Sequence, residues 1–131
     1  MSEEDEIIQP IGDLALQTIA MPKDANFNGD IFGGWLVSQM DLAGAVTANQ
    51  IANGRVATVA IDSMVFLSPV AIGSVISCYC SVIKVGRSSI ALDIEVWAKH
   101  PRNHEVRKVT EGKFTFVAIN DDKRTRPIAS A

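Results

Sequence analysis

The run from Asn26 to Asp41, NFNGDIFGGWLVSQMD, brings together residue types that suit acyl chemistry. Its paired glycines, Gly33 and Gly34, allow backbone N–H groups to approach a ligand closely. They stand where a helix is expected to begin, and the first turn of a helix has unpaired N–H donors and partial positive charge. Asp41 follows about two turns later. Donors aimed at a developing oxyanion, with a carboxylate nearby, are what hydrolysis of an activated acyl group requires.

Asp41 has two chemical routes open to it: it can activate water as a general base, or attack a carbonyl directly and form a mixed anhydride. Asn26 can donate and accept hydrogen bonds, which suits it to orient the water or the carbonyl, and an Asx turn at this residue is compatible with that role. Asp62 is the competing carboxylate, and we interpret it as structural or as a pocket wall. The sequence does not support a nucleophile–base pair between Ser38 and either histidine.

The elements that must position these residues follow from the pattern of apolar residues. We expect a strand over 14–21, a loop over 22–30, and a helix over 33–51 that Gly54 closes in a left-handed conformation. Four further strands are expected over 55–67, 73–85, 88–99 and 106–120, with a tight turn at Gly86 and Arg87. Strands that follow a single helix predict an α+β fold with an antiparallel sheet.

The expected helix has one charged side chain between Trp35 and Ala48, that of Asp41. A helix that is apolar nearly all round is normally buried. Gly44 and the neighbouring alanines allow another element to pack closely. In a chain of 131 residues we expect a sheet to wrap around this helix.

Length and composition predict a single domain over 1–131, with an acidic lead over 1–9 and a charged tail over 121–131 that are both expected to be mobile. The net charge of −3 gives no global attraction to nucleic acid or to an acidic membrane surface. The acidic N-terminus is unlike a secretory signal, and no apolar stretch reaches the roughly 18 residues of a membrane span. These features predict a cytoplasmic protein.

The two cysteines, Cys78 and Cys80, are too close along one strand for a disulfide, and we expect two reduced thiols that pack as small hydrophobes. His100 and His104 lie in a polar loop without a matching cysteine pair, so no metal site is expected.

Several short motifs occur in a specific order over about residues 16–119. They are Met21-Pro22 before Asn26, Asn28-Gly29, Gly33-Gly34, Asp41, TVAIDSM over 58–64, Pro69 with Gly73, and VGRSS over 85–89. In this order and spacing the chain resembles the hotdog-fold acyl-CoA thioesterases, in the branch of the bacterial YciA enzymes and the brain-type acyl-CoA hydrolases.

The resemblance implies one long central helix wrapped by a curved antiparallel sheet of about five to six strands. It implies homodimers joined edge to edge, often assembled into trimers of dimers, with acyl-CoA hydrolysed at the dimer interface. Asp41 matches the catalytic carboxylate, and Asn26 matches an asparagine that the other subunit supplies. The Gly-Arg-Ser-Ser run from Gly86 to Ser89 matches residues near the bound coenzyme A. No cofactor is required, because coenzyme A is part of the substrate.

The phosphates of coenzyme A require local basic groups, and Arg87 with Lys84 is the first choice, supported by Ser88, Ser89 and the backbone of Gly86. The second choices are Arg55, Arg107 and Lys108. Each of these cations is alternatively an ordinary solvated surface residue. The acyl chain is expected beside the helix, in an apolar tunnel to which four residues of the following strand contribute: Val59, Ile61, Met64 and Phe66. An ordinary place in the core is the simpler role for each of them.

Two other functions remain open on the same fold. A hotdog hydratase or dehydratase requires a histidine working with an acid near the helix, and both histidines lie after Lys99. A non-enzymatic acyl-CoA-binding module would keep the pocket but lose the carboxylate at Asp41.

Overall fold

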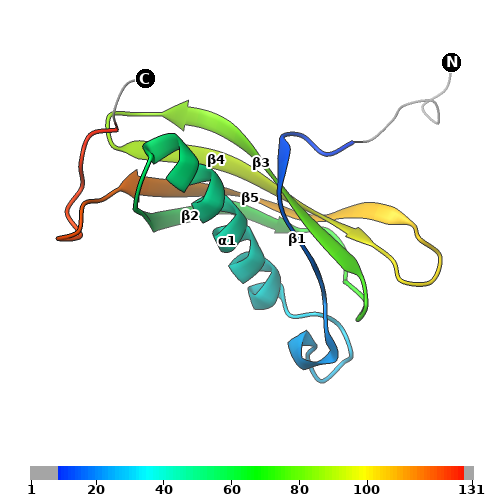
Figure 1. Ribbon diagram of the computed structural model, residues 1–131. Coiled ribbons are helices and arrows are strands. Elements are labelled where there is room, and N and C mark those ends of the chain that lie inside the picture. Colours follow the sequence, from blue (N-terminus) through cyan, green and yellow to red (C-terminus); the bar gives the residue numbers. More distant parts are fainter. Residues whose placement is uncertain (1–8, 129–131) are drawn as a thin grey trace, which may run out of the picture.

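The computed structural model describes residues 9–128, which form one long helix and five strands (Figure 1). The elements in chain order are β1 (Asp13–Ile19), the 3-10 helix η2 (Pro22–Asp24), α1 (Gly33–Ala52), β2 (Val56–Phe66), β3 (Val75–Val85), β4 (Ser89–Lys99) and β5 (Val106–Ala118). The predicted succession of a strand, a helix and four strands is confirmed.

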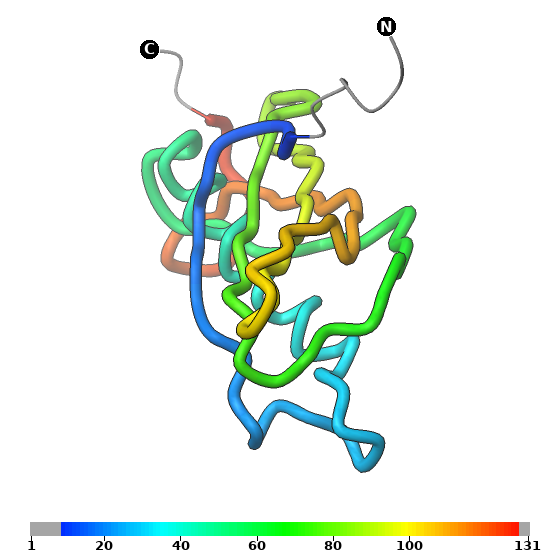
Figure 2. Tube along the Cα trace, turned by 90° about the vertical axis from the view of Figure 1, so that its right-hand side faces the viewer, coloured from blue at the N-terminus to red at the C-terminus, as the bar shows by residue number. Residues whose placement is uncertain are grey.

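The strands form one antiparallel sheet in the order β1-β3-β4-β5-β2, so that β1 and β2 lie at its two edges. α1 contacts all five strands, and the sheet curves behind it (Figure 1). Figure 2 shows the loop between β1 and α1 projecting from one end of the molecule. The predicted α+β architecture, a central helix wrapped by a curved antiparallel sheet, is confirmed.

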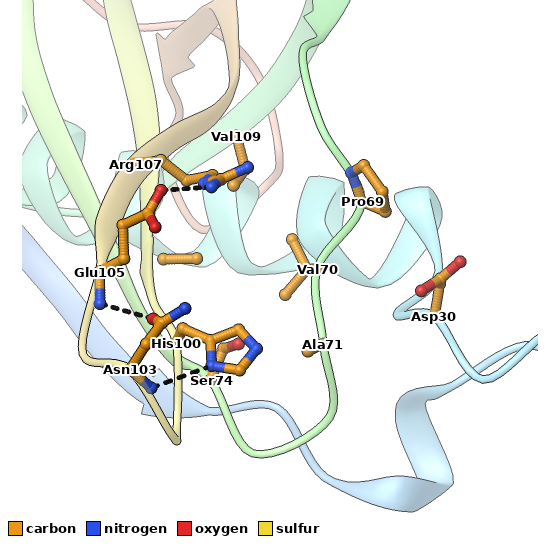
Figure 3. Close-up of a pocket in the computed structure, with 11 residues that line it drawn as sticks. Asp30, Pro69, Val70, Ala71, Ser74, His100, Asn103, Glu105, Arg107 and Val109 are labelled. Atoms are coloured by element: carbon orange, nitrogen blue, oxygen red, sulfur yellow. Dashed lines mark hydrogen bonds and ion pairs between the residues drawn. The ribbon is translucent and has the colours of Figure 1, made fainter.

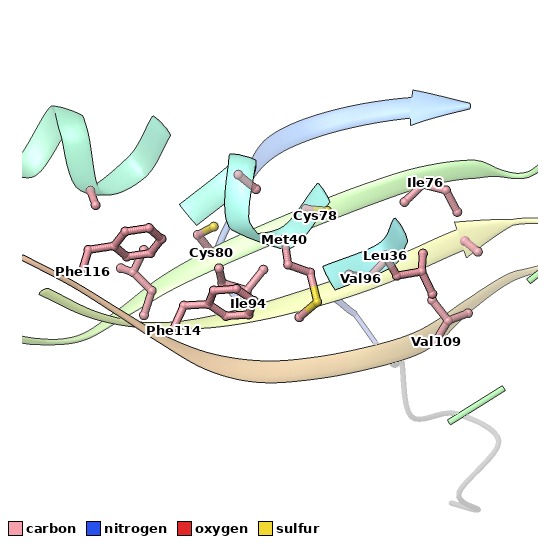
Figure 4. Packing of buried hydrophobic residues seen from close by; sticks show 14 of the residues in the cluster. Leu36, Met40, Ile76, Cys78, Cys80, Ile94, Val96, Val109, Phe114 and Phe116 are labelled. Carbon is pink, nitrogen blue, oxygen red and sulfur yellow. The ribbon is translucent and has the colours of Figure 1, made fainter. Parts of the chain in front are cut away.

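The core forms where alternate residues of the central strands meet one face of α1. The helix contributes Leu36, Met40, Ala43, Gly44, Ala48 and Ala52. Figure 4 shows Met40 among side chains of the sheet that include Phe114 and Ile94, both fully buried. A Cβ atom on Gly44 would lie 2.7 Å from the ring of Phe116 and 2.8 Å from Ile94 Cδ1. The absence of a side chain at Gly44 therefore allows the helix to approach the sheet closely.

The other face of α1 is open in the single chain. Leu42 and Val46 are 55% and 48% exposed. The prediction of a helix buried all round is therefore wrong for one chain, because the sheet curves around only one side of the helix. An apolar surface of this kind is typical of contact with another subunit.

The C-terminal end of the helix differs from prediction by one residue. Asn53, not Gly54, takes the left-handed conformation, with φ 51° and ψ 51°. Asparagine tolerates this region better than most residues with a side chain. Its backbone N–H donates to Asn49 O, which satisfies one carbonyl of the last turn.

Residues 121–128 of the charged tail turn back onto the sheet: Arg126 N donates to Ala118 O at 3.0 Å, and Ile128 N donates to Arg87 O at 2.7 Å. The charged composition of the tail does not predict long-range hydrogen bonds of this kind. Residues 1–8 and 129–131, the rest of the predicted mobile ends, lie outside the described residues.

Cys78 and Cys80 are buried and unbridged, as predicted. Burial raises the pKa of Cys78 to about 12, and burial also raises the pKa of Cys80. Within residues 9–128, no helix is long and apolar enough to cross a membrane. In the same part of the chain, no cluster of three or more histidine, cysteine or acidic side chains is arranged to hold a metal ion.

The sheet face away from α1 contains a buried carboxylate. Glu95 Oε1 accepts hydrogen bonds from Trp97 Nε1 at 2.9 Å and from Ile11 N at 3.2 Å. Lys108 Nζ lies 3.4 Å from Glu95 Oε2 and 2.6 Å from Glu111 Oε1. Burial alone would lower the pKa of Lys108, but the hydrogen bonds and charges of Glu111 and Glu95 outweigh it and raise that pKa.

Candidate active site

Asp41 lies in the middle of α1, on the side that faces edge strand β2. Its carboxylate Oδ1 accepts a hydrogen bond from Thr58 Oγ1 at 2.6 Å. The aspartate is half-buried, so one face of the carboxylate is held while the group remains open to a substrate or to water. A short hydrogen bond to a carboxylate fixes its position and orientation. Thr58 was not among the residues predicted for the site, although it begins one of the motifs that carry the resemblance.

The helix α1 begins at the paired glycines, as predicted, and the first turn of a helix has unpaired N–H donors. Phe32 is the N-cap residue and makes no side-chain capping hydrogen bond, and the first turn contains no acidic residue. Gly34 is exposed, and a Cβ atom there would have no neighbour within 4 Å. A Cβ atom on Gly33 would lie 3.3 Å from the ring of Phe66 at the end of β2. The first turn of α1 therefore lies beside the end of β2 at Gly33 and has open space next to Gly34.

Asn26 lies in the loop before the helix and organises that loop. Its side-chain Oδ1 accepts hydrogen bonds from Asn28 N at 2.8 Å and Asp30 N at 3.2 Å, while its backbone N–H donates to Asp30 O at 2.7 Å. This is the Asx-type turn that the sequence indicates. Within residues 9–128, no hydrogen bond engages the side-chain Nδ2, which leaves the amide donor of Asn26 available to a ligand.

These parts do not form one compact site within a single chain. Asp41 follows Gly33 by eight residues, which corresponds to about 12 Å along a helix axis. A carboxylate at that distance cannot attack, or activate water against, a carbonyl bound at the start of its own helix. We therefore interpret these parts as two half-sites beside β2. One is the start of α1 with its preceding loop, and the other is the Asp41–Thr58 pair.

The surface between the half-sites is apolar. On β2, Val59 and Ile61 are 56% and 42% exposed, and Phe66 is also exposed, whereas Met64 packs partly into the core. Asp62, the competing carboxylate, is exposed and pairs in register with Lys113 of β5. The outer edge of β2 has no strand partner within the described chain. An open strand edge with apolar side chains is suited to pairing with another chain.

The predicted basic residues separate into two groups. Arg87 is exposed at the turn between β3 and β4, where Gly86 N donates to Ser89 O at 2.7 Å. Ser88 O accepts from Ala118 N at 2.8 Å, and Lys84 is exposed on β3 close by in sequence. These residues form one polar turn near the C-terminal end of α1.

The second-choice cations are engaged elsewhere. Arg55 lies 3.7 Å from Asp121, and both side chains are exposed. Arg107 pairs with Glu105, and Lys108 pairs with Glu95 and Glu111. The turn at Arg87 therefore remains the best-placed candidate for a phosphate.

The histidines belong to a different part of the molecule. A cavity of about 380 Å³ lies between the β4–β5 loop and residues 69–71, and His100 lines it (Figure 3). His100 Nδ1 accepts a hydrogen bond from Arg102 N at 3.1 Å, so the ring stabilises its own loop. His104 lies in the same loop with φ 59°. Asp41 does not line this cavity, so His100 is not paired there with the carboxylate of the helix; the acidic residues of the cavity wall are Asp30 and Glu105.

A long helix held in a curved antiparallel sheet, with one oriented carboxylate beside an open edge strand, defines the class of hotdog-fold thioesterases. The family model for the thioesterase superfamily matches residues 28–104. The acyl-CoA thioester hydrolase YciA of Salmonella typhimurium is 50% identical over 122 residues, which cover 91% of this chain and 92% of the relative.

Two solved structures are similar over most of their length. A hexameric thioesterase from Yersinia pestis has 52% identity and a TM-score of 0.89, with 94% of this chain and 100% of that chain covered. A hexameric broad-specificity acyl-coenzyme A thioesterase has 50% identity and a TM-score of 0.90, with 94% and 85% covered. The chain belongs to the thioesterase superfamily, among the relatives of the YciA acyl-CoA thioester hydrolases.

Proposed function

We propose that this protein hydrolyses acyl-CoA thioesters and releases free coenzyme A and a carboxylic acid. The observation that carries the proposal is the half-buried Asp41 carboxylate, held by Thr58 on the face that also exposes the first turn of α1. The relatives that share half of its residues are acyl-CoA thioester hydrolases, which agrees with this chemistry. The reaction needs no cofactor, because coenzyme A enters with the substrate and leaves with the product.

In the proposed mechanism the thioester carbonyl oxygen accepts hydrogen bonds from backbone N–H groups of Gly33 and Gly34. Removing one such donor in other enzymes raises the barrier by about 3 kcal/mol. Asp41 accepts a proton from water as the water oxygen attacks the carbonyl carbon. The C–S bond then breaks, the acyl group leaves as the carboxylic acid, and the proton is returned to the sulfur of coenzyme A.

The active site is proposed to be shared between two subunits joined through their β2 edges. One chain supplies Asp41 and Thr58, and its partner supplies Asn26 and the first turn of α1. The separation of about 12 Å along the helix supports this division, since neither half-site is complete alone. The exposed Leu42 and Val46 would be covered in such an assembly. The hexameric relatives are consistent with a trimer of these dimers.

A mixing experiment tests the shared site. Asn26→Ala and Asp41→Ala are each expected to be nearly inactive, because each variant lacks one half-site. When the two variants exchange subunits in equal amounts, half of the dimers are mixed and each contains one intact site, so about one quarter of the wild-type activity should return. Native mass spectrometry confirms that exchange has occurred. Proven exchange without recovery of activity would show that the site lies within one chain.

A further inference from the structure

A cavity between the β3–β4 turn and the C-terminal segment is lined by two arginines. It has a volume of about 280 Å³, and its walls are Arg87, Ser88, Thr125, Arg126 and Pro127. Within residues 9–128, neither arginine forms an ion pair with a carboxylate. Two cations without a carboxylate partner among the described residues create a local positive potential at this cavity.

The C-terminal segment is joined to the turn by backbone hydrogen bonds on two sides. Ile128 N donates directly to Arg87 O at 2.7 Å. Ala118 at the end of β5 links the same two segments, because its N–H donates to Ser88 O at 2.8 Å and its carbonyl accepts from Arg126 N at 3.0 Å. Ile128 also packs against the hydrophobic core. The segment therefore braces the turn from outside.

The side chain of Arg126 fixes this brace to the body of the protein. Its Nε donates to Ile119 O at 3.1 Å, and its Nη2 donates to Ala52 O at 2.9 Å. The second contact places a cation at the C-terminal end of α1, where the helix dipole favours positive charge. Gly54 leaves the space for it, since a Cβ atom there would lie 2.7 Å from Nη2. The guanidinium is thus occupied by protein carbonyls, and it acts on a ligand through the segment that it holds.

We propose that residues 125–127 form one wall of the subsite for the phosphate groups of the substrate, and that Arg126 is a positioning residue for Arg87 and Ser88. This inference rests on the proposed function and adds the tail to the binding site. The Arg87 guanidinium and the Ser88 hydroxyl are suitable donors to phosphate oxygens. A turn that is already held loses less conformational freedom on binding, so the brace strengthens binding of the nucleotide part. It does not act on the thioester bond.

Two substrates with the same reacting bond test this role: an acyl-CoA and the matching acyl N-acetylcysteamine thioester, which has no phosphates. In full-length Arg126→Ala, KM for the acyl-CoA should rise about tenfold, equivalent to about 1.4 kcal/mol, with kcat within about twofold of wild type. The kcat/KM for the short thioester should not change. Arg124→Ala is the matched control, because it removes the same charge two residues away and Arg124 contributes only backbone groups to the hydrogen bonds of the tail.

A second variant covers the case in which Arg126→Ala does not fold. Thr125→Glu keeps every hydrogen bond of Arg126 and adds a carboxylate to the cavity wall, so it should raise KM for the acyl-CoA alone. The inference is overturned if KM for the acyl-CoA stays at the wild-type value in the folded variants, or if both substrates lose activity equally. If the wild-type protein hydrolyses neither substrate, the proposed function fails instead. If it hydrolyses both with the same kcat/KM, the function stands and the phosphate subsite is wrong.

Discussion

Gly44 is a position at which α1 approaches the sheet closely, and substitution by alanine tests that packing directly. The added Cβ would meet the Phe116 ring at 2.7 Å and Ile94 Cδ1 at 2.8 Å, whereas ordinary contacts begin at 3.4 Å. Both neighbours are fully buried and cannot move aside into solvent. The substitution must therefore displace the helix or distort the core.

Two opposing terms set the size of the effect. Alanine favours the helix over glycine by about 1 kcal/mol. An overlap of roughly 0.6 Å with rigid, buried side chains is of the kind that costs about 1–3 kcal/mol, and the two contacts place this case near the upper end. The net effect of Gly44→Ala is a destabilisation of about 1–2 kcal/mol, or a fall in Tm of about 4–8 °C for a chain of this size.

Gly34→Ala is the matched control, because it makes the same change in the same helix where nothing lies within 4 Å of the new Cβ. Its Tm should be unchanged or higher. Both variants are compared with wild type by thermal unfolding at one protein concentration, since association contributes to Tm. If Gly44→Ala is as stable as wild type, the helix does not pack against Phe116 and Ile94 as described.

Three further predictions concern the carboxylate partner, the buried thiols and the buried ion pair. Thr58→Val keeps the shape of the side chain but removes the hydrogen-bond donor to Asp41, so kcat/KM for an acyl-CoA should fall about tenfold, while Thr58→Ser should stay near wild type. Equal activity of the Val and Ser variants would exclude the role of the hydrogen bond. Burial raises the pKa of Cys78 to about 12, whereas the unfolded thiol ionises near 9.0, so the stability that the protonated thiol contributes is complete below pH 9 and is lost as pH rises toward 12. The urea midpoint of the wild-type protein should therefore fall over that range, and it should fall less in Cys78→Ala. An identical dependence on pH in both proteins would refute this prediction. Lys108→Met removes the cation beside Glu95, whose side chain is only 9% exposed, and should lower the free energy of unfolding in urea by about 1–3 kcal/mol. Adding Glu95→Gln should restore part of that stability, and an unchanged urea midpoint in the single variant would contradict the ion pair.

The elements of the fold are largely encoded in local patterns. The turn at Gly86 and Arg87 separates two alternating segments, and it does join β3 to β4. The order of the strands in the sheet is not encoded locally, because β2 pairs with β5 and the strands β3 and β4 lie between them in the sequence. No local pattern specifies such a pairing, and the order of the strands was not predicted.

The candidate site shows the same division between local and long-range information. The helix, its glycines and Asp41 are recognisable from residue type and spacing. Thr58 lies 17 residues beyond Asp41, and Arg126 meets Ala52 across 74 residues, so neither contact leaves a signature in the local sequence. The apolar Leu42 illustrates a further limit: its residue type indicates burial, but not whether the sheet or a second subunit covers it.

In the proposed mechanism Asp41 activates water against an acyl-CoA thioester, and release of free thiol from a panel of acyl-CoAs measures this directly. Wild-type protein should turn over at least part of the panel. Folded Asp41→Ala, and Asp41→Asn as the closest match in shape, should lose activity by about 10²- to 10⁴-fold, the usual contribution of a general base. Near-full activity in either folded variant would contradict the role of Asp41, and no thiol release by the wild-type protein with any acyl-CoA would contradict the proposed activity.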